Sequence, residues 1–383
     1  MLLSFGIICV ALITGYALFF KSRQRHYGNQ PISTFTLFAL LFTAGLDGGL
    51  IILPLTEFAQ YEDTTTSPEY GFTNPLAIEF GFWAFLVWLI YFSSCFYFCF
   101  FEPKLKFFEI PFIKWLNNIL VAFTCAFSAA LLFKSLPWYF PQWAEAEQFN
   151  AFSIVLISSV IFIAVYFSAQ FKHVKQLGRI SFITFIVLIL SMAVSSQFHL
   201  TDFNTYIPLI GDYFFHLEKF INPVSSYHEF YLFWWFAWSI MIGQFVSQHV
   251  NGQKTWQLLI MFLVIPALPI AIWFMVLYHY YLNDLTTHGF YLQAMAWIGI
   301  LFVINSLDTL IRLYSNNLKL NTEKLGPARY WAVHSSLLLL LTALFTLDFV
   351  KIHYIGGAVI CMFAAMMVFG LRKCLRTPKW PSI

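Results

Sequence analysis

The chain has 383 residues and a formal net charge of +3; 60% of its residues are hydrophobic and only 10% are charged. With a mean hydropathy of +0.73, this composition excludes an ordinary soluble domain and indicates a protein of the lipid bilayer. The small positive charge gives no support to nucleic-acid binding.

Eleven apolar stretches follow one another, each of roughly 17 to 26 residues and able to cross about 30 Å of hydrocarbon as a helix. We therefore expect an all-α integral membrane protein with about 11 transmembrane helices. The first stretch is interpreted as a retained helix and not a signal peptide, because no charged residue precedes it and no small-residue cleavage site ends it. The stretches lie at about 3–20, 34–57, 78–101, 115–134, 151–171, 180–198, 227–248, 257–281, 289–313, 330–349 and 354–371.

The second stretch contains a glycine-rich segment with a carboxylate. Gly45, Gly48 and Gly49 surround Asp47, and Pro54 follows. Glycine and proline weaken a helix, which a membrane tolerates where the backbone lines a cavity or a binding site. Close packing of helices through small residues is the alternative. Asp47 favours the binding site, because a carboxylate at that depth must be neutral, paired with a cation or in contact with water.

The third and seventh stretches each carry three large aromatic residues. On a helix the first set falls within an arc of about 140° and the second within about 100°, so each set can face one site. A methylated cation has no proton to donate but is attracted to the faces of such rings. A membrane-interface belt is the alternative for each ring taken alone. The six residues are Trp83, Trp88, Tyr91, Trp234, Trp235 and Trp238.

The rest of the chain adds a polar cluster in the ninth stretch: Asn305, Ser306, Asp308 and Thr309. Hydrogen bonding within the helix, with an interfacial Asp, is the alternative to a binding role. The segment 199–226 is amphipathic and predicts a helix along the surface. No histidine pair has the spacing of a metal site, and no nucleophile elbow or phosphate-binding loop occurs, so we expect neither a metal centre nor an enzyme.

Basic residues alternate between the connections. With the N-terminus outside, eighteen Lys and Arg fall on the inner face and only Lys134, Lys219 and Lys351 on the outer face. Short basic loops resist translocation. We expect a multi-pass protein of the cell (inner) membrane with its C-terminus in the cytoplasm.

Four segments, in order along the chain, resemble the betaine/choline/carnitine transporters. FWWFAWSIMIGQFVSQHVNG is similar to the family signature WWxSWxPFVGxFIARISRGR, and GFWAFLVWLIY matches the aromatic spacing of the fourth family helix. TAGLDGGLIILPLTEF resembles SAGMGIGLMFWGVAEP of the third, and VINSLDT resembles TSADS of the tenth. The resemblance runs from about residue 10 to residue 371.

The resemblance implies two inverted five-helix repeats after one accessory helix, where the family normally has two accessory helices. We expect an accessory helix and basic loop at 1–33, the first repeat at 34–198, the external amphipathic segment at 199–226, the second repeat at 227–371 and a basic cytoplasmic tail at 372–383. A homotrimer is also expected only from the resemblance.

The resemblance further implies roles for particular residues. The six aromatic residues would form a box around a trimethylammonium group. The glycine-rich segment itself, apart from the resemblance, adds Asp47, Gly45, Gly48 and Gly49 as candidate solute-binding residues. Ala44, Leu46, Asn305 and Ser306 would fall near a sodium site, with Na⁺ as coupling ion and no other cofactor. Family members have a small residue in place of Asp47, which could therefore titrate instead of sodium or pair with the solute. The arginines of the inner signature are absent.

We predict a secondary transporter of a quaternary ammonium or other methylated onium solute, of the betaine, choline or carnitine type. It would work by alternating access and couple transport to a cation or a proton. A membrane subunit or solute sensor that is derived from such transporters and no longer transports is the alternative.

Overall fold

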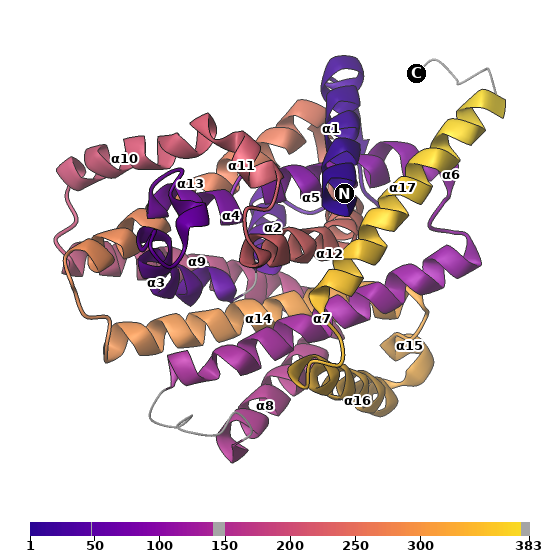
Figure 1. The fold of residues 1–383 in the computed structure, drawn as a ribbon. Helices are drawn as coiled ribbons and strands as arrows, with labels where there is room; N and C mark the ends of the chain where they lie inside the picture. The colour runs from indigo at the N-terminus through magenta and orange to yellow at the C-terminus, as the bar shows by residue number, and fades with distance from the viewer. Residues whose placement is uncertain (47, 141–149, 377–383) are drawn as a thin grey trace.

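The computed structural model describes residues 1–46, 48–140 and 150–376, and the chain there is helical apart from one pair of short strands (Figure 1). Its first half contains α1 (Leu2–Lys21), β1 (Arg25–Tyr27), α2 (Thr34–Leu46), α3 (Gly49–Glu62), η1 (Pro68–Tyr70), α4 (Pro75–Trp83), α5 (Leu86–Phe96), η2 (Tyr97–Phe101), α6 (Glu102–Leu105), α7 (Pro111–Tyr139), α8 (Ala151–Ser168) and α9 (Phe171–Ser195). Its second half contains α10 (Leu200–Phe215), α11 (Leu217–Ile221), α12 (Ser226–His249), β2 (Asn251–Lys254), α13 (Thr255–Leu282), α14 (Phe290–Asn317), α15 (Thr322–Leu325), α16 (Pro327–Thr346) and α17 (Ile352–Arg376).

Ten helical segments in the described ranges are long and apolar enough to cross a membrane, with Pro75–Leu105 counted as one, and the shorter α2 is apolar as well. The expected all-α integral membrane fold is confirmed. Large apolar side chains lie exposed along the outer helices, where lipid would cover them. Examples are Val155 and Ile163 on α8, Val187 and Leu190 on α9, and Leu268 on α13.

Side-chain caps begin several of these helices. Asn74 Oδ1 accepts from the Ala77 backbone N–H at 3.0 Å ahead of α4, and the Ser225 hydroxyl accepts from the His228 N–H at 3.0 Å ahead of α12. Asn150 caps α8 in the same way. Each cap satisfies a backbone donor that the first helical turn leaves open, so the sequence itself defines where these helices begin.

The helices of the first half of the chain and those of the second half form two sets that pack on each other. Between the sets, α14 contacts α8 and α7 contacts α16; within them, α2 contacts α9 and α12 contacts α17. α7 lies beside α14, and α8 crosses α16 (Figure 1). The two inverted repeats expected from the family resemblance stay a prediction.

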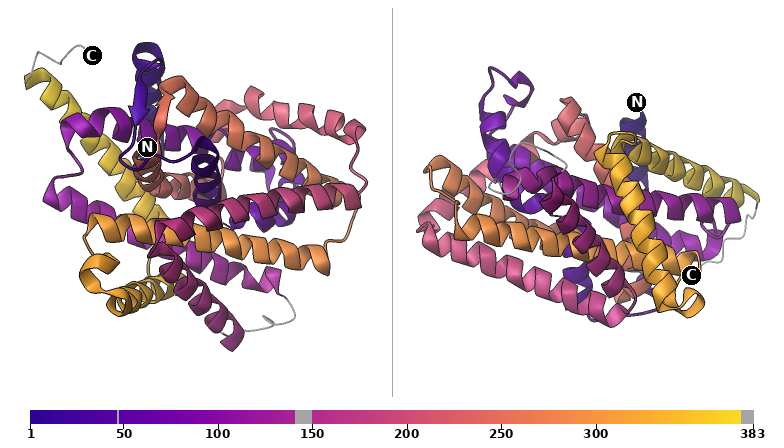
Figure 2. Two further views of the ribbon diagram at one scale, coloured as in Figure 1. Left: turned by 180° about the vertical axis from the view of Figure 1, so that it is seen from behind. Right: turned by 90° about the horizontal axis from the view of Figure 1, so that it is seen from below.

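The two sets interlock around α12 and α5. Gly243 of α12 lies so close to α5 that a Cβ atom there would be 2.7 Å from the Cys95 backbone nitrogen. Outside this centre, α9 runs alongside α14 in the reverse view of Figure 2, and α10 packs on α4 and α13. The expected helix in segment 199–226 is α10, which leaves Leu200 and Phe215 exposed.

Two connections pair through the antiparallel strands β1 and β2, which follow α1 and α12. His26 of β1 is buried there, and its Nε2 lies 2.8 Å from the Thr255 hydroxyl. Burial lowers the pKa of His26 to about 4, because removal from water disfavours the charged imidazolium.

Two of the predicted membrane stretches are divided into shorter helices. In the second stretch α2 ends at Leu46 and α3 begins at Gly49, where the glycines predicted a weakened helix. The third stretch lies within one candidate membrane span, Pro75–Leu105, but it is not one continuous helix as expected: α4 ends at Trp83, and α5 begins at Leu86. Phe85 has a φ of +48° and the Leu86 N–H donates to the Ala84 carbonyl at 2.6 Å, which is a tight γ-turn.

Candidate solute-binding site

Three of the predicted indoles form one cluster. The Trp83 ring of α4 packs edge-on against Trp234 and Trp235 of α12, with centroids 5.6 and 5.1 Å apart. Trp234 and Trp235 are stacked at 4.7 Å, and Tyr231 packs against all three rings. All of these rings are buried. We call Trp83, Tyr231, Trp234 and Trp235 the indole cluster.

Two more of the predicted rings form a separate contact. Trp88 and Tyr91 of α5 pack edge-on at 5.6 Å and are fully buried. Because the helix breaks after Trp83, the arc predicted for one continuous helix does not describe how Trp83 lies relative to this pair. Trp238 is fully buried one turn beyond Trp235, and within the described ranges its ring contacts none of the other five.

The predicted glycines lie between these two groups of rings. A Cβ atom on Gly45 would touch Trp88 and Tyr91, whereas one on Gly49 would touch Trp83 and Trp234. A Cβ atom on Gly48 would lie 2.9 Å from the Gly299 carbonyl of α14, closer than real Cβ atoms approach. The glycines thus let the divided second stretch approach both aromatic groups and α14. Asp47 lies outside the described residues.

Polar side chains bond the backbone where the two stretches are divided. The Tyr91 hydroxyl donates to the Gly45 carbonyl at 3.1 Å, and the Tyr139 hydroxyl donates to that of Gly48 at 3.3 Å. Trp235 Nε1 donates to the Phe82 carbonyl, next to the γ-turn, at 2.8 Å. These bonds tie carbonyl groups at both breaks to side chains of other helices, so tertiary contacts help to hold the breaks.

The predicted sodium-site residues meet where α2 packs on α14. Asn305 Nδ2 donates to the Thr43 hydroxyl at 2.5 Å, and the Ser306 hydroxyl lies 3.4 Å from the carbonyls of Thr43 and Ala44. The Asn305 amide oxygen is buried and has no hydrogen-bond partner. Leu46, at the end of α2, is fully buried. The oxygen atoms that could coordinate a cation here belong to hydroxyl, carbonyl and amide groups, and a hard cation prefers such ligands.

The second polar pair of α14 lies close by. Asp308 is fully buried; one of its carboxyl oxygens accepts from the Thr309 hydroxyl at 3.1 Å, and the other has no partner. Asp308 interacts electrostatically with Arg312, one turn further along the same helix. The polar segment 305–309 is therefore buried within the protein.

The described residues leave no ligand-sized cavity between the indole rings. The cavity next to Gly48 and Gly49 and the one next to Trp235 each hold about 10 Å³. A cation lies within about 6 Å of the ring centroids that bind it, so rings in direct contact at 5.1 to 5.6 Å leave no room for an onium group between them. The structure has the rings closed against each other.

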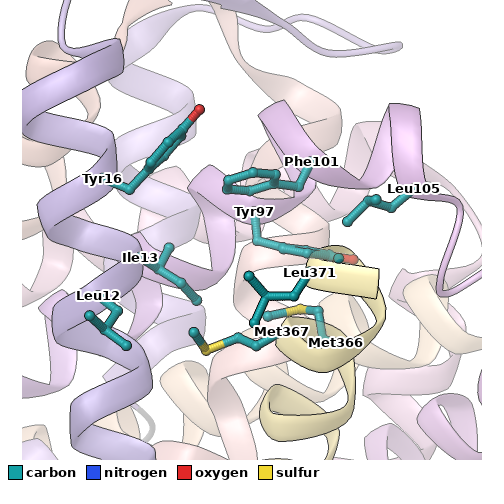
Figure 3. Close-up of a pocket in the computed structure, with 10 residues that line it drawn as sticks. Leu12, Ile13, Tyr16, Tyr97, Phe101, Leu105, Met366, Met367 and Leu371 are labelled. Atoms are coloured by element: carbon teal, nitrogen blue, oxygen red, sulfur yellow. The ribbon is translucent and has the colours of Figure 1, made fainter. Parts of the chain in front are cut away.

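A larger cavity of about 400 Å³ lies elsewhere, between α1, the segment Tyr97–Leu105 and α17 (Figure 3). Apolar side chains such as Ile13 and Met366 line it, together with the rings of Tyr16, Tyr97 and Phe101. It contains none of the predicted site residues and no acidic side chain, so its chemistry suits an apolar occupant.

Sequence reasoning missed two buried carboxyl groups beside the indole cluster. Glu57 of α3 is 5% exposed, and Glu79 of α4 is fully buried. The Glu57 carboxyl accepts hydrogen bonds from the hydroxyls of Tyr61, Tyr227 and Tyr231. The signal was available, because an acidic residue inside an apolar stretch is costly and usually functional.

We compared the chain with known proteins. No protein-family model matches it. Part of the chain is similar to the glycine betaine transporter OpuD of Bacillus subtilis (strain 168), with 26% identity over 140 residues. The match covers 33% of this chain and 27% of that transporter's length. The chain is thus a multi-pass membrane protein with partial similarity to a betaine transporter, which supports the predicted resemblance in part.

Proposed function

We propose that the chain is a secondary active transporter of a quaternary ammonium or other methylated onium solute, working by alternating access. The observation that carries the proposal is the convergence of two aromatic groups on the divided second stretch, through Gly45 and Gly49. The partial similarity to a glycine betaine transporter supports the same solute class. In this function the protein is a carrier and not an enzyme.

The onium head would bind among the indoles, with Trp88, Tyr91 and Trp238 completing the box in the bound state. Each contact between a cation and a ring face contributes about 0.5 to 2 kcal/mol. Because Trp83, Trp234 and Trp235 touch one another, binding requires α4 to move away from α12. The γ-turn at Phe85 and the break between α2 and α3 supply points at which such a movement would bend the chain.

A coupling cation would bind at the oxygens of Thr43, Ala44, Asn305 and Ser306, next to the same break. One movement of α2 and α3 would then respond to both ligands, which gives a coupling free energy between them. We place the protein in the cell (inner) membrane with its N-terminus outside, from the distribution of basic residues, and we propose a homotrimer from the family resemblance.

Uptake into proteoliposomes tests the proposal. Labelled glycine betaine, choline and carnitine are offered with sodium and proton gradients imposed separately. We expect saturable uptake of at least one solute under one gradient. Absence of uptake, counterflow and binding by a folded protein would overturn the proposal. Binding without counterflow would instead support a solute sensor or a transport-inactive subunit.

A ring variant with a matched control sharpens the test. Trp234→Leu removes one electron-rich face next to Gly49, and we expect onium binding to weaken by up to about thirtyfold. Trp256→Leu changes an indole that is 42% exposed at the start of α13, and binding should not change. Equal affinities in both variants would contradict the assignment of the indole cluster as the solute site.

A further inference from the structure

The two carboxyl groups beside the indole cluster differ in their surroundings. Glu57 accepts from Tyr61 at 2.6 Å, from Tyr231 at 3.2 Å and from Tyr227. Phenol hydroxyls donate and so stabilise a carboxylate. Neither oxygen of Glu79 has a hydrogen-bond partner, although Glu57, Tyr61 and Trp83 are its polar neighbours. The surroundings of Glu57 thus favour its charged form, whereas those of Glu79 favour its neutral form.

Among the described residues, no positive charge is paired with these two carboxyl groups. The ion pairs there are Lys106–Glu109 and Lys134–Asp348, and neither includes Glu57 or Glu79. Besides the two carboxyl groups themselves, the titratable groups in the described ranges that interact with Glu57 are tyrosines. They are Tyr61 on α3, Tyr70 on η1, and Tyr227 and Tyr231 on α12.

Other described elements packed against α3 and α4 present rings on this side, and the Asp212 carboxylate of α10 accepts from Asn74 Nδ2 ahead of α4. Tyr213 of α10 packs on Phe80, Tyr278 of α13 packs on Phe58, and His228 of α12 is stacked on Phe82 with its Nδ1 accepting from the Val224 N–H. Two adjacent negative charges buried without a cation are strongly unfavourable, so such a pair retains a proton.

A second feature points from the pair toward a ligand. Trp83 is fully buried, its indole N–H has no hydrogen-bond partner, and its polar neighbour is Glu79. The same ring contacts Trp234 and Trp235. A cation that entered the indole cluster would therefore lie one ring away from two carboxyl groups that have no positive charge of their own.

We propose that Glu57 and Glu79 share one proton while the indole cluster is closed, and that an onium head entering the cluster displaces this proton. The proposal rests on the proposed function. The displaced proton passes from the carboxylic acid to water, and the carboxylate then balances the charge of the onium group. Because solute and proton compete, the coupling is exchange: the transporter moves the solute in one direction and a proton in the other.

Calorimetry on the purified full-length protein tests this exchange. Choline and tetramethylammonium are titrated in two buffers with different ionisation enthalpies, which reports the protons released. We expect about one proton released per bound onium, and affinity falling by about tenfold for each pH unit below the range where the pair deprotonates. In proteoliposomes, an inside-acid gradient should drive uptake.

Glu79→Gln removes the exchangeable proton with little change in shape, so proton release and the pH dependence of affinity should disappear. Glu69→Gln, an exposed glutamate on η1, is the control and should retain both. Onium binding that releases no proton in the unmodified protein would overturn the exchange and leave the proposed function standing. Failure of every onium compound to bind would instead overturn the proposed function. The measurement on the unmodified protein decides the question even if a variant does not fold.

Discussion

The two segments that carry the aromatic residues are built differently. α12 runs without interruption through Trp234, Trp235 and Trp238, whereas α4 ends at Trp83 and α5 carries Trp88 and Tyr91. The intact helix holds its rings in a fixed relation. The divided segment can move Trp83 and Glu79 relative to the rest. In the proposed transport cycle, α12 would be the fixed side of the site and α4 the side that moves.

The largest expected effect is at the contact between these two segments. Gly243→Ala places a Cβ atom against the Ser94 hydroxyl and 2.7 Å from the Cys95 nitrogen, and backbone cannot give way cheaply. We expect a loss of about 3 kcal/mol or more, since overpacking of a core often costs that much. Thermal unfolding in detergent measures it. Gly211→Ala on α10 meets nothing within 4 Å and should be neutral or slightly stabilising; similar losses in both variants would contradict the close contact.

The next largest effect is a difference in stability between variants of Trp234 and of Trp235, the stacked pair of α12. Trp235 donates its indole N–H to the Phe82 carbonyl, but the N–H of Trp234 has no partner. Trp235→Phe leaves a buried carbonyl unbonded beside the γ-turn, which costs about 1 to 3 kcal/mol, whereas Trp234→Phe loses no hydrogen bond. Thermal unfolding of both variants should rank Trp235→Phe as the less stable. The reverse order would show that this bond does not hold the break.

The difference between the two segments also shows which parts of the fold the sequence can predict. Apolar length predicts the long helices, and the glycines from Gly45 to Gly49 predict the division of the second stretch. Nothing local predicts the break at Phe85, because Ala84 and Phe85 are ordinary helix residues. The break depends on the distant Trp235 bond and on packing of Phe85 against Phe214 of α10, at 4.9 Å between ring centroids.

The candidate site, too, can be predicted from the sequence only in part. Trp234 and Trp235 are neighbours in the sequence and stack on each other, but whether Trp83 joins them depends on the turn that separates it from Trp88. The role of Glu79 also requires the fold, because only packing reveals that Glu57 takes the tyrosine donors and leaves Glu79 with none. Local pattern predicts which residues share a helix face; it does not predict which buried groups stay unsatisfied.

A smaller effect tests the γ-turn directly. Inside a helix alanine is more stable than glycine by about 1 kcal/mol, so Ala237→Gly in α12 should cost about that amount. At Phe85 the positive φ disfavours any Cβ atom, so Phe85→Gly should be more stable than Phe85→Ala by about 1 kcal/mol. Both variants lose the same ring, which leaves the backbone as the difference. If alanine is the more stable there, the segment is a continuous helix.

The smallest expected effect concerns β1, which contacts the end of α5 and pairs with β2, the strand that follows α12. His26 packs edge-on against Phe96 at the end of α5, and its strand pairs with the one that follows α12. Its pKa is about 4 in the fold against 6.5 when free, so between these values the unfolded chain binds more protons, and stability falls as pH falls. Between pH 7 and pH 6 we expect a loss of about 0.7 kcal/mol from this residue. His26→Asn should remove that part of the pH dependence of thermal unfolding, whereas His288→Asn, on an exposed loop, should retain it. An unchanged pH dependence in His26→Asn would mean that the fold does not hold the His26 imidazole in its neutral form. The contacts of β1 with α5 and β2 would then not depend on the protonation state of His26.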